Sequence, residues 1–123
     1  MSGISLFADT NIIVYLLNGN KRISELLDGN EVYLSFITEL ELFGKKNLSS
    51  SEKRKIASFV EQCLIIDINS SIKKQVISIR EKYFIKLPDA IIVATAIEFD
   101  MPFFTADKQI SQIKELTSFV IDI

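Results

Sequence analysis

The sequence of 123 residues contains 48% hydrophobic residues, no histidine, one cysteine and a formal net charge of −2 at pH 7. It predicts one domain, residues 1–123, with a single buried core, and its charge gives no global attraction to nucleic acid. The lack of histidine excludes the usual zinc sites and His-based catalysis, and the single Cys63 excludes an internal disulfide, so carboxylates, lysines, hydroxyls and hard metal ions remain for chemistry.

The N-terminal stretch MSGISLF has neither the basic region nor the long apolar run of a signal peptide. No window of the sequence reaches the roughly 18 uninterrupted apolar residues of a membrane span. We therefore expect a cytoplasmic protein with no membrane contact.

Short runs rich in β-branched and aromatic residues alternate with longer runs of helical periodicity. The predicted strands are residues 4–8, 31–37, 64–68, 102–105 and 118–121. The predicted helices are residues 11–17, 23–27, 38–46, 51–62, 71–84, 88–99 and 108–115. This alternation implies right-handed crossovers and a mostly parallel sheet covered on both faces. The predicted fold class is α/β, a three-layer α/β/α sandwich of about five strands. The stretch DAIIVATAIEF, apolar almost all round, predicts a central buried helix.

Four acidic side chains follow predicted strands or begin predicted helices. Asp9 directly follows the first strand, and Asp107 lies two residues past the fourth, within FFTADK. Glu41 lies in the first turn after SFIT, and Asp89 in the first turn after LP. Ligands of open parallel sheets bind beyond the carboxyl ends of the strands, where the winding direction reverses. We expect the four carboxylates to converge there if the first and fourth strands are neighbours.

Each acid also has a local explanation at a helix start. Asp9 and Asp107 can cap the helices that follow them, and Asp89 complements the helix dipole behind Pro88. Glu41 forms a T-x-x-E capping box with Thr38. These local explanations are individually sufficient, but all four acids lie on the face where α/β proteins bind ligands.

A tight cluster of these acids requires a cation. Two carboxylates about 5 Å apart repel by roughly 3 kcal/mol at an effective dielectric constant of 20, and four acids make several such pairs. All-oxygen ligands suit Mg²⁺ or Mn²⁺, and these ions activate water and stabilise charge on a transferring phosphoryl group.

Four sequence blocks resemble the acidic motifs of the PIN-domain family and, within it, the VapC-like toxins of type II toxin–antitoxin systems. The blocks are DTNIIVYLL, SFITELELFG, LPDAIIVATA and FFTADKQI, and they occur in the family's order. The resemblance implies that Asp9 is the first metal ligand, Glu41 the second acid, Asp89 the third and Asp107 the more variable fourth. Glu39 is the neighbour of Glu41 that points to nearly the opposite side of the helix, and the family spacing from Thr38 favours Glu41.

The resemblance also implies the activity and the partners. PIN proteins are typically Mg²⁺- or Mn²⁺-dependent endoribonucleases that use metal-activated water, and Asp9 and Asp89 are the expected direct ligands. VapC-like members cleave RNA, form homodimers and are silenced by a cognate antitoxin. The expected supporting residues are Thr10 and Asn11, which match the polar pair that orients the first acid, and Thr105.

Basic residues next to the motifs are candidates for contact with RNA phosphates: Lys45, Lys46, Lys86 and Lys108. The alternative for each lysine is an ordinary solvated surface position. We expect the dimer interface on an exposed apolar patch of the helices within residues 11–46 or 51–62.

Two other functions are compatible with parts of the pattern. A phosphoacceptor receiver domain would place Asp67 at the end of the third strand and use Thr105 and Lys108. It would also need an acidic pair after the first strand, where this chain has Asp9 followed by Thr10 and Asn11. The second alternative is a catalytically silent PIN fold that serves as a binding module.

Overall fold

The computed structural model describes residues 3–123, so Met1 and Ser2 of the MSGISLF stretch lie outside the described residues. Its elements, in chain order, are β1 (Ser5–Ala8), α1 (Thr10–Leu17), α2 (Lys21–Leu27), β2 (Glu31–Ser35), α3 (Phe36–Phe43), α4 (Ser50–Glu61), β3 (Leu64–Ile66), α5 (Ser70–Lys82), α6 (Leu87–Glu98), β4 (Phe103–Thr105), the 3-10 helix η1 (Lys108–Gln112) and β5 (Ser118–Val120). This order confirms the predicted alternation of strands and helices.

All strand pairs in the five-stranded sheet are parallel, and the strand order is β3-β2-β1-β4-β5. Strand β1 is central and pairs with β2 on one side and β4 on the other, so that Phe7 lies opposite both Tyr33 and Phe103. The chain builds the sheet outward from β1 in one direction through β3 and then in the other through β5. This arrangement confirms the predicted α/β fold and places its winding reversal between β1 and β4.

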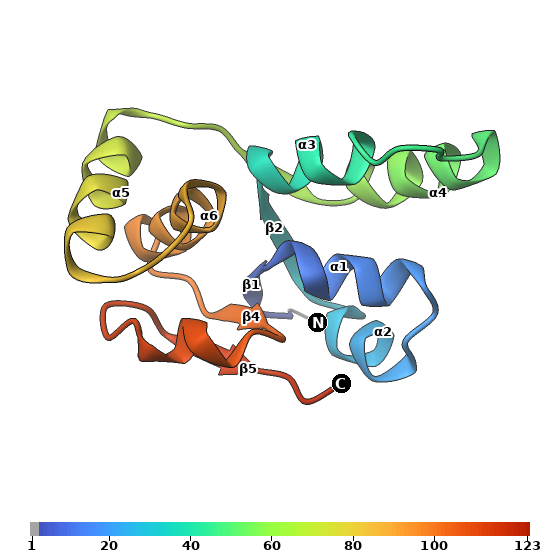
Figure 1. Cartoon of the computed structure of the whole chain (residues 1–123). Coiled ribbons are helices and arrows are strands. Elements are labelled where there is room, and N and C mark those ends of the chain that lie inside the picture. Colours follow the sequence, from blue (N-terminus) through green and yellow to red (C-terminus); the bar gives the residue numbers. More distant parts are fainter. Residues whose placement is uncertain (1–2) are drawn as a thin grey trace.

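The central strands bury side chains on both faces, which is why they read as apolar runs. Leu6 and Ala8 pack with residues of α1, α2 and α4 in one core cluster, whereas Phe7 packs with residues of α6 and η1 in another. In Figure 1, α5 and α6 lie together on one side of the sheet and α1 and α2 on the other. Helix α6 is buried from Ala90 to Ala96 except at half-buried Ile91, which confirms the predicted central helix.

Several predicted boundaries are wrong for local physical reasons. The second strand ends at Ser35, because the Ser35 hydroxyl accepts a 3.1 Å hydrogen bond from the N–H of Ile37 and caps α3. Helix α3 therefore starts earlier than predicted, and it ends before Gly44. The predicted helix 108–115 is only the short 3-10 helix η1, which buries Ile110 and is followed directly by the buried Ile113; this three-residue spacing is the period of a 3-10 helix.

Within residues 3–123, no helix is both long enough and apolar enough to cross a membrane.

Candidate functional site

The carboxyl ends of β1 and β4 lie side by side and bring Asp9 and Thr105 into contact. Asp9 follows the last residue of β1, and the Thr105 hydroxyl donates a 2.6 Å hydrogen bond to Oδ2 of Asp9. The same hydroxyl accepts a 3.0 Å bond from the N–H of Asp107. The first and fourth strands are thus neighbours at the winding reversal, as the convergence of the acids requires.

Asp9 is a buried carboxylate with partners on both oxygens. Its Oδ1 accepts a 2.8 Å hydrogen bond from the N–H of Thr10 and caps α1, which confirms the predicted capping role. The same carboxylate thus serves both as a helix cap and as part of the site. Burial raises the pKa of Asp9 to about 6, against the lowering effect of the bonds from Thr105 and Thr10. The negative charges of Asp89 and Asp107 contribute smaller parts of this rise.

Asp89 lies in the first turn of α6, directly behind Pro88, as predicted. The residue before the helix is Lys86, whose side chain makes no capping hydrogen bond. Burial raises the pKa of the half-buried Asp89, and the charges of Glu41 and Asp107 raise it further, whereas Lys86 lowers it. The side chains of the four predicted acids therefore act on one another electrostatically.

Glu41 reaches the same place by a contact that the sequence analysis did not foresee. The predicted capping box of Thr38 and Glu41 is wrong, because Ser35 caps α3 and the acid in its first turn is Glu39. The buried Thr38 hydroxyl instead lies 2.8 Å from Oγ1 of Thr10, and Thr10 donates a 2.7 Å bond to Oε1 of Glu41. Helices α1 and α3 are joined by this short chain of hydroxyls.

All four predicted acids line one cleft of about 530 Å³ at the carboxyl edge of β1 and β4. The complete lining is Asp9, Thr10, Asn11, Val14, Tyr15, Glu41, Asp89 and Asp107. Asn11 belongs to the wall and also accepts a 3.2 Å hydrogen bond from the N–H of Ala106, which ties α1 to the segment after β4. Asp107 caps η1 by accepting a 3.0 Å bond from the N–H of Gln109.

The acids line the cleft without forming a closed metal cage. Among residues 3–123, no group of three His, Cys, Asp or Glu side chains is arranged closely enough to hold a metal ion. Mg²⁺ is ordinarily bound through one or two carboxylates and keeps several of its water molecules. The cleft offers carboxylate and hydroxyl oxygens, and neighbouring acids help to raise the pKa values of Asp9 and Asp89; this donor set fits such a partly hydrated cation.

The four candidate lysines have different acidic neighbours. Lys86 precedes α6 and acts on the pKa of Asp89, and Lys108 directly follows Asp107. Lys45 and Lys46 follow the end of α3, and the charge of Lys45 acts on Glu52 in the first turn of α4. None of the four lysines lines the acidic cleft.

Thr38 and Tyr15 are the main residues of the site that the sequence analysis missed or set aside. Tyr15 lies on α1 and lines the cleft one and a half turns after Asp9. Thr38 was treated only as a cap, although its position in the SFIT block next to the predicted acid was a usable signal. The receiver arrangement is not found: Asp67 is exposed beyond the edge strand β3, two strands from β1, and its carboxylate accepts from the N–H of Ile68.

Residues 6–116 match the family model described as the PIN domain. The chain belongs to the PIN-domain family. The match covers all four acids of the cleft, and PIN domains are typically nucleases. The sheet order and the six helices are those of a PIN-like fold.

Several solved structures that resemble this chain come from toxin–antitoxin complexes. The chain is 28% identical to a protein of a toxin–antitoxin complex from Klebsiella pneumoniae, with a TM-score of 0.77 and coverage of 94% of this chain and 99% of that one. It is 25% identical to a chain of FitAcB from Neisseria gonorrhoeae, with a TM-score of 0.75 and coverage of 93% and 96%. VapBC2 from Rickettsia felis, bound to a promoter DNA fragment, shares the fold with a TM-score of 0.79, 23% identity and coverage of 97% and 99%. Comparison with curated protein sequences gives no match.

Proposed function

We propose that this PIN domain is a metal-dependent endoribonuclease and the toxin of a type II toxin–antitoxin pair. The observation that carries the proposal is the cleft that four acids from different segments line together: Asp9, Glu41, Asp89 and Asp107. The charges of the neighbouring acids help to raise the pKa values of Asp9 and Asp89. An arrangement that raises the pKa of a buried carboxylate to about 6 is costly for folding, and such perturbed groups cluster at functional sites. Helix capping alone explains none of this electrostatic coupling.

Asp9 and Asp89 are the proposed direct ligands of Mg²⁺ or Mn²⁺, with Glu41 and Asp107 acting through the ion's remaining water molecules. When bound, such an ion supplies a water of lowered pKa and stabilises negative charge on the phosphoryl group. The chain has no histidine, and this assignment needs none. The acids on their own supply four negative charges that only a cation or protons offset.

The other polar groups of the cleft hold these acids in place. Thr105 and the N–H of Thr10 fix both oxygens of Asp9, so that carboxylate keeps one orientation. The Thr10 hydroxyl fixes Glu41, and Asn11 holds α1 against the segment that carries Asp107. These three residues are positioning residues rather than ligands in this proposal.

The proposed partner is a cognate antitoxin whose segment covers the acidic cleft. The support is the similarity to proteins from toxin–antitoxin complexes of Klebsiella pneumoniae and Neisseria gonorrhoeae.

We also propose a homodimer, with the exposed Leu40 and Phe43 of α3 as the apolar patch that the sequence analysis expected between residues 11 and 46. Sedimentation of wild type and Leu40→Glu tests this: the substitution should produce monomers, and unchanged dimers would exclude this patch.

Cleavage of total cellular RNA on a denaturing gel tests the proposed activity. Wild type should give discrete fragments with Mg²⁺ or Mn²⁺ and none with excess chelator. Asp9→Asn should give no fragments, whereas Asp67→Asn, an exposed aspartate beyond β3, should cleave as wild type does. Equal cleavage by wild type and Asp9→Asn would show that the activity is not that of this site. RNA left intact by wild type under all conditions would favour the silent binding module.

A further inference from the structure

A second hollow of about 850 Å³ adjoins the acidic cleft. Asp89 and Asp107 line both hollows, so these two carboxylates form their shared border. The far side of the second hollow is formed by the loop between α5 and α6 and by residues of η1. A chain that passes the acids can therefore continue directly into this hollow.

Hydrogen bonds hold the wall of the second hollow in a fixed position. The hydroxyl of Tyr83 donates a 2.8 Å bond to Oε1 of Glu115 and accepts a 3.2 Å bond from the N–H of Lys114. Lys82 makes a 2.8 Å ion pair with the other carboxylate oxygen of Glu115. The end of α5 is thus attached to the segment that follows η1, and the hollow is preformed.

The wall carries cations that are available to a ligand. Lys82 is neutralised by Glu115, but within residues 3–123 neither Arg80 nor Lys86 makes an ion pair. The Nε–H of Arg80 donates a 3.3 Å bond to the carbonyl of Ile85, which holds the guanidinium at the loop and leaves its terminal donors for other partners. Arginine and lysine side chains are the usual contacts to phosphate oxygens. Two positive side chains therefore border an acidic centre in a chain of negative net charge.

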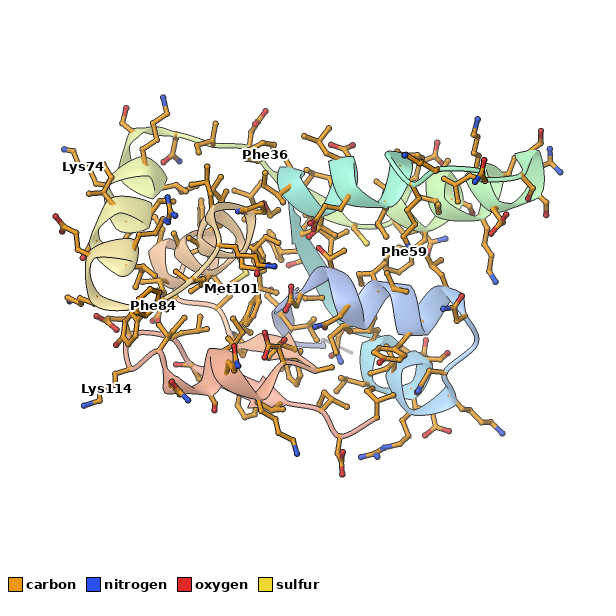
Figure 2. All side chains as sticks on the ribbon, in the orientation of Figure 1. Phe36, Phe59, Lys74, Phe84, Met101 and Lys114 are labelled. Carbon is orange, nitrogen blue, oxygen red and sulfur yellow. The ribbon has the colours of Figure 1, made fainter. Side chains whose placement is uncertain are left out.

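Phe84 lies in the same wall and is fully exposed. Figure 2 shows Phe84 at the end of α5, and the residue belongs to none of the three core clusters. A large aromatic ring gains nothing for folding in this position. Exposed aromatic rings beside a basic groove are the platforms on which proteins stack unpaired bases.

We infer that the second hollow binds a single-stranded segment of RNA next to the phosphate that is cleaved at the proposed metal site. An unpaired base stacks on Phe84, and phosphates of the same strand contact Arg80 and Lys86. The inference rests on the proposed function for the identity of the nucleic acid. It excludes duplex RNA from this hollow, because the faces of paired bases are already covered by their neighbours.

The lack of tryptophan in the chain gives a direct probe of the stacking. Phe84→Trp introduces a single indole at the proposed platform, and excess chelator prevents cleavage during the titration. Single-stranded oligoribonucleotides should quench this fluorescence with saturation, and the same strand annealed into a duplex should not. Phe99→Trp, at the exposed far end of α6, is the matched control and should show no saturable quenching. Equal quenching by duplex and single strand, or no quenching of Phe84→Trp, would overturn the inference.

Binding constants measured by fluorescence anisotropy in chelator test the individual contacts. Phe84→Ala should weaken single-strand binding about tenfold, the effect of losing one stacked base. Arg80→Gln and Lys86→Gln should each reduce the slope of log affinity against log salt by about 0.7, the value for one lost phosphate contact on a single strand. The matched controls, Phe99→Ala, Arg54→Gln and Lys74→Gln, should bind as wild type; Figure 2 shows Lys74 at the opposite end of α5 from Phe84. Wild-type affinity and salt slope in all three hollow variants would contradict the inference.

The binding assays and the cleavage assay can refute the two proposals separately. Suppose that metal-dependent cleavage is lost in Asp9→Asn but is unaffected by Phe84→Ala, Arg80→Gln and Lys86→Gln. This result would refute RNA binding in the second hollow and would support the nuclease activity. Saturable quenching of Phe84→Trp without any metal-dependent cleavage would refute the nuclease and leave the hollow as a single-strand binding site.

Discussion

The hydroxyl of Thr105 donates a 2.6 Å hydrogen bond to Asp9 across 96 positions of sequence. Both residues are buried: Asp9 directly follows β1 and Thr105 is the last residue of β4, the two strands between which the winding of the sheet reverses. This bond is the direct physical link between the strand order and the proposed metal ligand. It also lowers the pKa of a carboxylate that burial raises to about 6.

Thr105→Val should therefore raise the pKa of Asp9 further. Because protons and the divalent cation compete for this carboxylate, the metal concentration needed for half-maximal RNA cleavage should increase, most strongly below pH 7. The lost hydrogen bonds should also cost about 1 kcal/mol of unfolding free energy. Thr95→Val is the matched control, since its equally buried hydroxyl bonds only to the carbonyl of Ile91 within α6. An identical metal and pH dependence in wild type and Thr105→Val would show that this bond does not tune Asp9.

The raised pKa of Asp9 predicts an unusual pH dependence of stability in metal-free protein. Between about pH 4 and 6 the folded protein keeps a proton on Asp9 that the unfolded chain has released, so unfolding free energy should fall as pH rises through this window. Asp9→Asn should lose the part of this decrease that is due to Asp9, leaving the part due to the raised pKa of Asp89, and at pH 7 it should be more stable than wild type by up to about 3 kcal/mol. Urea unfolding in chelator at several pH values measures both effects.

Another shifted acid does not obscure this window. The pKa of Glu115 is lowered to about 2, chiefly by its bonds from Lys82 and Tyr83, so its stabilising effect is lost only as pH falls from about 4.5 towards 2. Asp67→Asn, at an exposed position, should follow wild type at every pH. If the unfolding free energies of wild type and Asp9→Asn change with pH in parallel between pH 4 and 6, the raised pKa of Asp9 is disproved.

The corrected start of α3 yields a prediction that separates stability from activity. Ser35→Ala removes the cap of the helix that carries Glu41 and should cost about 1 kcal/mol and also reduce cleavage. Ser49→Ala removes the capping-box serine of α4, which does not line the cleft, and should cost a similar amount while cleavage is unchanged. Thermal unfolding and cleavage rates of the two variants provide the comparison. Equal activity of both would show that the position of Glu41 does not depend on this cap.

The sequence predicted the fold well because each strand is a short apolar run separated by strong periodic helices. The convergence of the acids was predicted only on the condition that β1 and β4 are neighbours. The sequence could not predict this, since strand order depends on packing that no local pattern encodes. The acids were found because strand ends and helix starts have clear signals. The Thr10–Thr38 contact and the cluster of Arg80, Phe84 and Lys86 beside Asp89 were missed, because they join residues whose proximity exists only in the folded chain. The capping box of Ser49 and Glu52 at the start of α4, an S-x-x-E pattern, was not predicted either.

Binding of Mn²⁺ at pH 7, measured by titration calorimetry together with thermal unfolding, tests the central claim most directly. Wild type and Asp67→Asn should bind the ion and gain stability, by about 2.7 kcal/mol at a free concentration 100 times Kd. Asp9→Asn and Asp89→Asn should gain none, although Asp9→Asn starts from the higher stability predicted above. The same Mn²⁺ response in all four proteins would contradict a metal site formed by the carboxylates at the junction of β1 and β4.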